Sequence, residues 1–359
     1  MGTEQLIGDD GEWCARIKLI QMRRAYNQNG FRPTQSDLTM FNFLKAARES
    51  YYVGAILATI AKPIRFACFQ IGTEIERKVK KNGVAISLPN GRVLRIDRDA
   101  GVGLASLLFW NGLDGYEVDT SETLRFFFER TVTFVDVGAN YGLYSILGAL
   151  WNRDLRVVAF EPVPQICRAL RRNVALNGLE KQVSAHQLAL ADRGGTATFY
   201  LPSSESRDSE TTGTLVADSW QSRQDSPTIA VETVRFDDFE RTHPMKVDLV
   251  KIDVEDFEAG LLAGMERTIR RDRPFIVCEI LPRAHHNEKT REVVESLGYS
   301  PYWITPLGYI RASRFDFERR FSQDFLLSPV SPPNKVITNL ESFWALRESS
   351  ALIERTQTT

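Results

Sequence analysis

The chain has 359 residues, a formal net charge of −1, 43% hydrophobic residues and 25% charged residues. These values are typical of a soluble globular protein, and the length favours one large domain with an appendage. A charge so close to zero supplies no general attraction for nucleic acid or for an anionic membrane, so neither is an expected partner.

The cysteines and the first residues of the chain indicate in which cellular compartment the protein is expected. The four cysteines form no C-x-x-C pair, and they are Cys14, Cys68, Cys167 and Cys278. A chain of this size does not need disulfides, so we expect reduced thiols and a cytoplasmic protein. Asp9, Asp10 and Glu12 stand where a signal peptide would need apolar residues. The apolar segment Tyr51–Ala61 is too short to span a bilayer, so no transmembrane segment is predicted.

The chain divides into four predicted regions. Residues 1–80 are expected to form a mainly helical N-terminal extension. Residues 81–125 read as a hairpin, turning at Pro89–Gly91, followed by a lead-in to the core. Residues 126–330 are the predicted main domain, and 331–359 are a tail in which a helix is expected.

Strands and helices alternate regularly from about residue 131. The predicted strands of the alternating part are 133–138, 156–161, 183–190, 247–254 and 274–280, followed by 299–305, 308–313 and 323–330. Leu143, Ile146, Leu147 and Leu150 form one apolar helical stripe after the first strand. An inserted pair of strands is expected at 196–202 and 229–236, around a polar stretch, Ser203–Ser226. This alternation predicts an α/β fold with a mostly parallel sheet flanked by helices.

Acidic residues follow the predicted strands. Ligands of parallel sheets bind outside the carboxyl ends of the strands, so the residues at those ends are the first site candidates. They are Asp136, Glu161, Asp192, Asp253 and Glu279.

The turn "DVGANYG" lies at the end of the first strand. It fails the dinucleotide pattern G-x-G-x-x-G, because Asn140 and Leu143 occupy the second and third glycine positions after Gly138. It also lacks the Gly-Lys-Ser/Thr of a phosphate-binding loop. Asp136 would repel a phosphate, so the turn suits a cationic ligand that carries none.

Glu161 and Asp192 extend this interpretation. A carboxylate at the end of the second strand accepts hydrogen bonds from ribose hydroxyls in such folds. Asp192, after the third predicted strand, is a candidate for the adenine amino group. A ribose, a positive charge and no phosphate describe S-adenosylmethionine, which is the predicted cofactor.

The motifs together resemble the FkbM family of class I S-adenosylmethionine-dependent methyltransferases. The matching segments are "FVDVGANYGLYS", "VVAFEPVP", "LRRNVALNG", "LALADRGGTATF" and "VDLVKIDVEDFEAGLLAG". The resemblance implies a Rossmann-like, seven-stranded sheet and methyl transfer, usually to oxygen on sugars or secondary metabolites. By match, it implies cofactor or active-site roles for Asp136, Gly138, Asn140, Gly142, Glu161 and Asp253. The family usually reads D-V-E-G-x-E, whereas this chain has Asp256 at the glycine position.

A hydroxyl acceptor must lose a proton, so a base is expected. The candidates are Asp253, Glu255, Glu279, His285 and His286, with Asp253 the first choice for an active-site carboxylate. The histidines titrate near neutral pH, although an exposed loop pair is the alternative reading of "AHH". Asp253 and Glu279 could hold a divalent cation, but no further ligand is evident and no metal is predicted.

Three rival classes stay open at this point. A nucleic-acid methyltransferase is disfavoured by the near-zero net charge and by the absence of an N/D-P-P-Y segment. A nicotinamide-dependent oxidoreductase shares the fold but needs the missing glycine. A non-catalytic protein that binds S-adenosylmethionine is favoured by the bulk and charge of Asp256. For the methyltransferase, we expect a small-molecule or glycan acceptor between the ends of the fourth and fifth strands, roofed by N-terminal residues and by Ser203–Ser226.

Overall fold

The computed structural model describes residues 83–97, 102–113, 116–202, 213–217, 226–281, 284–305, 308–312, 323–332 and 336–337. The chain divides into two units, Met1–Lys81 and Asn82–Thr359, and the described residues all belong to the second. The predicted helical extension and the predicted C-terminal helix therefore lie outside the described residues, as does most of Ser203–Ser226. The proposed domain boundaries stay predictions.

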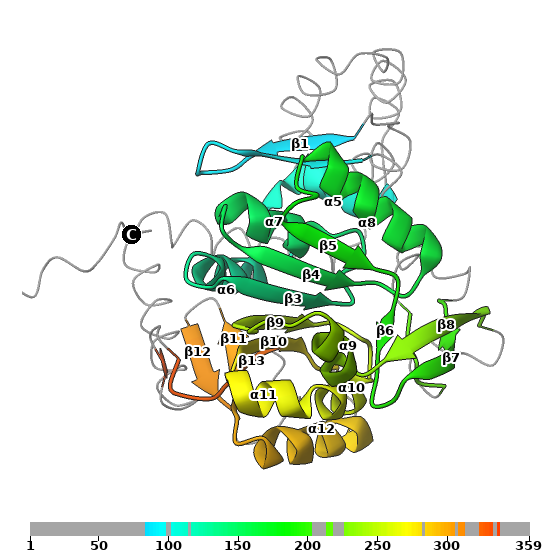
Figure 1. Cartoon of the computed structure of the whole chain (residues 1–359). Helices are drawn as coiled ribbons and strands as arrows, with labels where there is room; N and C mark the ends of the chain where they lie inside the picture. The colour runs from blue at the N-terminus through cyan, green and yellow to red at the C-terminus, as the bar shows by residue number, and fades with distance from the viewer. Residues whose placement is uncertain are drawn as a thin grey trace, which may run out of the picture. The chain divides into compact units, whose positions relative to one another are not determined.

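A nine-stranded sheet runs through the described part of the chain (Figure 1). Its strands, in spatial order, are β14 (Val336–Ile337), β12 (Gly308–Arg311), β11 (Ser300–Thr305), β13 (Asp324–Ser328), β10 (Phe275–Glu279), β9 (Leu249–Ile252), β3 (Thr133–Val137), β4 (Arg156–Phe160) and β5 (Val183–His186). Five of the eight pairings are parallel, and β13 lies antiparallel between β10 and β11. The predicted α/β class and the mostly parallel sheet are confirmed. The sheet has nine strands rather than the seven that the resemblance implied, and β14 is the strand that the predicted segments did not include.

The central strands are buried on both faces, as parallel strands between two helical layers must be. All five residues of β3 and all four residues of β9 are buried. Asp136 and Lys251 are the charged members of these two strands, and they are register partners. Two charges in the middle of an apolar sheet mark the region where chemistry is expected.

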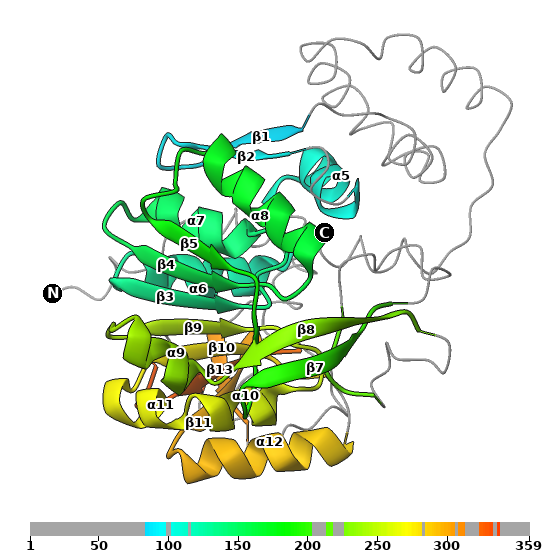
Figure 2. The same cartoon turned by 45° about the vertical axis from the view of Figure 1, so that its right-hand side comes forward.

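Helices cover both faces of the sheet (Figures 1 and 2). One layer holds α6 (Val118–Phe128), α7 (Leu143–Trp151) and α8 (Pro164–Leu176). The hairpin of β1 (Val84–Ser87) and β2 (Val93–Ile96) joins the same apolar cluster, as does α5 (Val102–Asn111). The opposite layer holds α9 (Phe236–Thr242), α10 (Glu258–Gly264), α11 (Glu266–Asp272) and α12 (Ala284–Ser296).

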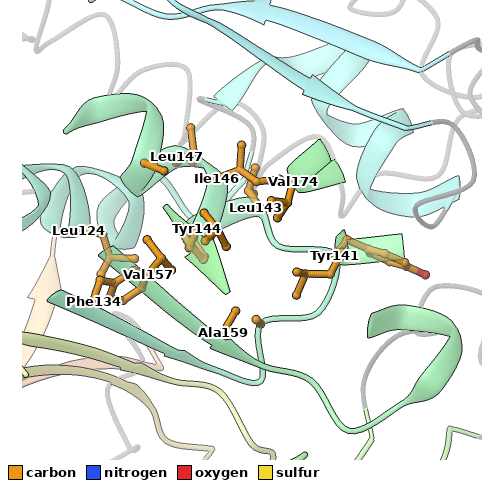
Figure 3. Packing of buried hydrophobic residues seen from close by; sticks show 14 of the residues in the cluster. Leu124, Phe134, Tyr141, Leu143, Tyr144, Ile146, Leu147, Val157, Ala159 and Val174 are labelled. Carbon is orange, nitrogen blue, oxygen red and sulfur yellow. The ribbon is translucent and has the colours of Figure 1, made fainter. Parts of the chain in front are cut away.

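Helix α7 shows why the sequence pattern predicts the packing. Its apolar stripe is buried, and Figure 3 shows Ile146 and Leu147 in one cluster with Phe134 and Val157 of the sheet. Because these side chains pack together, α7 is held against the sheet. The glycine turn, which joins β3 to α7, is therefore restrained at both ends. None of the helices in the described ranges is both long and apolar enough to cross a membrane.

The third predicted strand divides in two. β5 ends at His186, and the chain then leaves the main sheet to form β6 (Ala189–Leu190), which pairs with β8 (Thr228–Val234). β8 also pairs antiparallel with β7 (Gly195–Tyr200), which confirms the predicted inserted pair. This three-stranded sheet extends to one side of the main sheet (Figure 2). Thr214 forms a bridge to Tyr200 and holds residues 213–217 beside it.

Candidate functional site

The turn after β3 is packed closely against the strand beside it. The backbone N–H groups of Gly138 and Ala139 both donate to the carbonyl oxygen of Phe160, each over 3.0 Å. Gly138 has φ +74°, and a Cβ there would lie 1.8 Å from the carbonyl oxygen of Asp253. Any side chain would clash, so glycine is required by both the backbone angle and the lack of space.

A cavity with an empty volume of about 620 Å³ opens at the carboxyl ends of β3, β4 and β9. Its polar wall is formed by Gly138, Asn140, Glu161, Asp253 and Glu255. Apolar side chains complete it, including Phe160, Leu190, Phe199 and Leu215. Neither lysine nor arginine is among the described residues that line this cavity.

Glu161 forms part of the cavity wall and of the backbone scaffold. Its Oε2 accepts the N–H of Asn140 over 3.1 Å, and its Oε1 accepts the N–H of Val163 over 2.8 Å. Burial raises the pKa of Glu161 to about 7, although these two N–H donors oppose the rise. Each carboxyl oxygen has a second lone pair, so the group can also accept hydroxyls from a ligand.

Asp136 lies behind the turn, and it is not among the residues that line the cavity. It is 1% exposed, and its Oδ2 accepts the hydroxyl of Ser145 over 2.6 Å. Burial raises its pKa, while the charge of Lys251 lowers it. Its Oδ1 is buried with no hydrogen-bond partner within the described ranges.

Gly142 and Asp192 also lie away from the cavity lining. Gly142 precedes α7 with φ +83°, and a Cβ there would meet Leu170 of α8 at 3.0 Å. Asp192 is exposed, two residues beyond β6, and its backbone oxygen accepts Nη1 of Arg235 over 2.8 Å. Gly142 therefore contributes to helix packing, and Asp192 lies in a different place from the cavity lining where a contact with the cofactor was expected; the cofactor roles of both residues stay predictions. The split of the third strand explains the second difference, because it moves this loop to the smaller sheet.

The predicted active-site carboxylates meet at one edge of the sheet. Asp253 lines the cavity, and its Oδ2 lies 2.8 Å from Nζ of Lys251. The carboxyl group of Glu279, the last residue of β10, lies within hydrogen-bonding reach of Asp253. Asp324 begins β13 and is the register partner of Glu279. Sequence reasoning missed Lys251 and Asp324. A lysine inside the apolar run "VDLVKIDV" was the available signal for Lys251.

His285 and His286 belong to the first turn of α12, so the reading of this pair as a loop was wrong. Their side chains lie outside the described residues, and their role as bases stays a prediction. Across the described ranges no cluster of three or more histidine, cysteine or acidic side chains is arranged to hold a metal ion.

Residues 136–301 match a family model described as the methyltransferase FkbM domain. This part of the chain is an FkbM methyltransferase domain. The segments from Phe134 to Gly264 on which the resemblance rested lie almost entirely inside it.

Individual relatives of the FkbM domain are distant. Methyltransferase sdnD of Sordaria araneosa is 29% identical over 154 residues, which span 37% of this chain and 60% of sdnD. Methyltransferase 1 of Beauveria bassiana is 25% identical over 189 residues, or 48% of this chain and 76% of the relative. A solved structure of the methyltransferase FkbM from Methylobacillus flagellatus is 14% identical, covering 81% of this chain and 59% of that one, with a TM-score of 0.37.

The position where this FkbM domain departs from the resemblance is strained. Glu255 and Asp256 have φ of +51° and +78°, which non-glycine residues rarely adopt. Thr214 donates its hydroxyl to the carbonyl oxygen of Glu255 over 2.5 Å. The N–H of Asp256 is bonded to Oε1 of Glu258 over 3.0 Å. These bonds hold a turn that a glycine would adopt without strain.

Proposed function

We propose that this protein is an S-adenosylmethionine-dependent methyltransferase that methylates a hydroxyl of a sugar or a secondary metabolite. The observation that carries the proposal is the arrangement of the cavity wall. Glu161 and Asn140 stand on the β3–β4 side of the cavity, and Asp253 stands where β9 ends. The two sides can serve a cofactor and an acceptor that meet between them.

The residues fit this cofactor by charge and by hydrogen bonding. Oδ1 of Asn140 is buried at the cavity without a partner in the described part of the chain, so it can accept an N–H of a ligand. Glu161 can accept the hydroxyls of a ribose. The cofactor, when bound, supplies a methyl group on a positively charged sulfur, which acidic surroundings favour over a phosphate-bearing ligand.

In this proposal the protein mainly aligns two substrates, an effect that can be worth about 7–11 kcal/mol. Asp253 accepts the proton of the acceptor hydroxyl, because it lines the cavity where β9 ends, on the side away from Glu161, which serves the cofactor. His285 and His286, which follow β10 on α12, remain the alternative bases.

Methyl transfer can be measured with S-adenosylmethionine labelled in its methyl group and a panel of hydroxylated sugars and secondary metabolites. We expect label in at least one acceptor, and a loss of at least about tenfold in turnover for Asp253→Asn. The cofactor affinity of this variant should change much less, because the contact acts mainly in the transition state. Cofactor binding without any transfer would favour the non-catalytic alternative, to which the strained Asp256 points.

A further inference from the structure

Lys251 is a buried cation in an acidic region. It is 3% exposed, and its register partner on β3 is Asp136. Its Nζ lies 2.8 Å from Oδ2 of Asp253 and 5.1 Å from the ring centre of Tyr144. A lysine is almost never buried so deeply unless it is paired, so its pairing with Asp253 is a defining feature of the site.

Three carboxyl groups, which we call the carboxyl row, stand on adjacent strands beside this lysine. They are Asp253 after β9, Glu279 at the end of β10 and Asp324 at the start of β13. The carboxyl groups of Asp253 and Glu279 lie within hydrogen-bonding reach of each other, and Glu279 and Asp324 are register partners. Carboxyl groups this close cannot all be ionised at once, so the row must divide into ionised and protonated members.

The surroundings of the carboxyl row favour one distribution of protons among its three members. Burial and the charges of Asp253 and Asp324 raise the pKa of Glu279 well above its usual range. Burial also raises the pKa of Asp324 to about 7. Burial acts the same way on Asp253, but the charge of Lys251 and its hydrogen bond outweigh it and lower the pKa of this group. Among the described residues, the other titratable groups that interact with Lys251 or with the row include Glu117, Tyr116, Asp136, Tyr144, Glu161, Glu255 and Cys278.

We propose that Lys251 is a positioning residue that makes Asp253 the ionised member of the carboxyl row, while Glu279 stays protonated and donates its O–H to Asp253. The geometry supports this division, because Lys251 contacts Asp253 directly and Asp253 is the member of the row that lines the cavity. The inference goes beyond the identity of the base, since it states what selects one carboxyl among three.

The consequence for catalysis rests on the proposed function. The acceptor oxygen forms a bond to the methyl carbon, the carbon–sulfur bond breaks, and its electron pair stays on sulfur. The hydroxyl proton passes to Oδ of Asp253 and then to solvent. A carboxylate can take that proton only if it arrives ionised, which is the condition that Lys251 supplies.

Titration of the full chain without any ligand tests the inference. Carboxyl ¹³C resonances of labelled aspartate and glutamate can be followed against pH by NMR, with Asp253 and Glu279 assigned from Asp253→Asn and Glu279→Gln. We expect the midpoint of Asp253 to lie below that of Glu279. In Lys251→Met, the midpoint of Asp253 should rise by about 1–3 pH units, the usual effect of losing a close opposite charge.

Lys246→Met is the matched control. Lys246 pairs with Asp248 at the same two-residue spacing over 3.1 Å, but its side chain is 74% exposed. This variant should leave the Asp253 midpoint unchanged. An unchanged Asp253 midpoint in folded Lys251→Met would overturn the proposal. A reversed order of the two midpoints in the unmodified protein would also overturn it, even if Lys251→Met does not fold.

Glu279→Gln tests the second half of the proposal. Glutamine keeps a donor to Asp253 but cannot ionise, so the Asp253 midpoint should stay within about half a unit. A fall of a unit or more would show that Glu279 had carried a charge, and would contradict its protonated role. These titrations use no S-adenosylmethionine, so a failure to bind that cofactor would sink the proposed function and leave their result standing.

Discussion

The backbone N–H of Asn140 donates to Oε2 of Glu161 over 3.1 Å, and this bond ties the turn after β3 to the end of β4. The other oxygen of Glu161 accepts the N–H of Val163. Glu161 therefore shapes the backbone and forms the cavity wall at once. A substitution of this residue must be designed so that its effects on folding and on binding can be separated.

Glu161→Gln should weaken S-adenosylmethionine binding by about tenfold or more, because a hydrogen bond to a charged group contributes about 1.5–3 kcal/mol. Glu161→Gln should also lower the free energy of unfolding, because its amide nitrogen cannot accept one of the two backbone N–H groups. Glu161→Ala should lower it further, by about 1–3 kcal/mol, since it leaves both buried N–H donors without their acceptor. Calorimetry gives the affinity and urea unfolding gives the stability. Glu180→Gln, at an exposed position, is the control. Equal affinities for Glu161→Gln and the unmodified protein would show that the ligand does not contact Glu161.

Gly138→Ala should be far more harmful than Gly91→Ala. Both glycines have similar backbone angles, with φ of +74° and +80°. A Cβ at Gly138 meets the carbonyl oxygen of Asp253 at 1.8 Å, whereas a Cβ at Gly91 has no heavy atom within 4 Å. The left-handed conformation costs each alanine about 1–2 kcal/mol. Any further loss of stability in Gly138→Ala therefore measures the clash with Asp253. Thermal unfolding of the two variants gives the comparison, and similar losses would mean that the turn can move away from Asp253.

Asp256→Gly should stabilise the protein relative to Asp256→Ala by about 1 kcal/mol. Both substitutions remove the same carboxylate and its contacts, but only glycine adopts φ of +78° without strain. Urea unfolding of the two variants isolates the backbone term. If the Asp256→Ala variant is as stable as Asp256→Gly, Asp256 does not strain this turn. The residue would then give no support to the non-catalytic alternative.

Glu258 should make stability fall as pH rises. Burial raises its pKa from 4.5 to about 8, and the charges of Asp256 and Glu255 act in the same direction. Between these values the folded protein holds a proton that the unfolded chain has released. The free energy of unfolding then decreases with rising pH, by up to about 1.4 kcal/mol per pH unit.

Glu258→Gln should remove this part of the pH dependence between about pH 4.5 and 8. Urea unfolding at several pH values in that window measures it. Glu266→Gln is the control, because Glu266 forms an exposed pair with Arg270. Identical pH slopes for Glu258→Gln and the unmodified protein would contradict the predicted protonation.

Periodicity and strand-end chemistry predicted much of this structure. The stripe of α7, the strand that ends before Asp253 and the helix that begins at Pro164 depend on local patterns, and all three are present. The positions of Glu161 and Asp253 on either side of the end of β3 follow from the strand order β9-β3-β4.

Other features depend on contacts that no local pattern encodes. The apolar run around Lys251 predicts a buried strand but not the acidic neighbours that make a buried lysine stable. The departure of the chain after His186 depends on pairing with β8, more than forty residues later. Gly142 is indistinguishable from Gly138 by sequence, yet the space beside it belongs to Leu170.

Calorimetric titration of the full chain with S-adenosylmethionine in EDTA tests the central claim most directly. We predict binding of this ligand and of its demethylated product without added metal, with dissociation constants below the millimolar range. NAD should not bind, because its pyrophosphate would meet an acidic wall and a turn without the second glycine. Absence of S-adenosylmethionine binding at millimolar concentration, or a preference for NAD, would contradict the account.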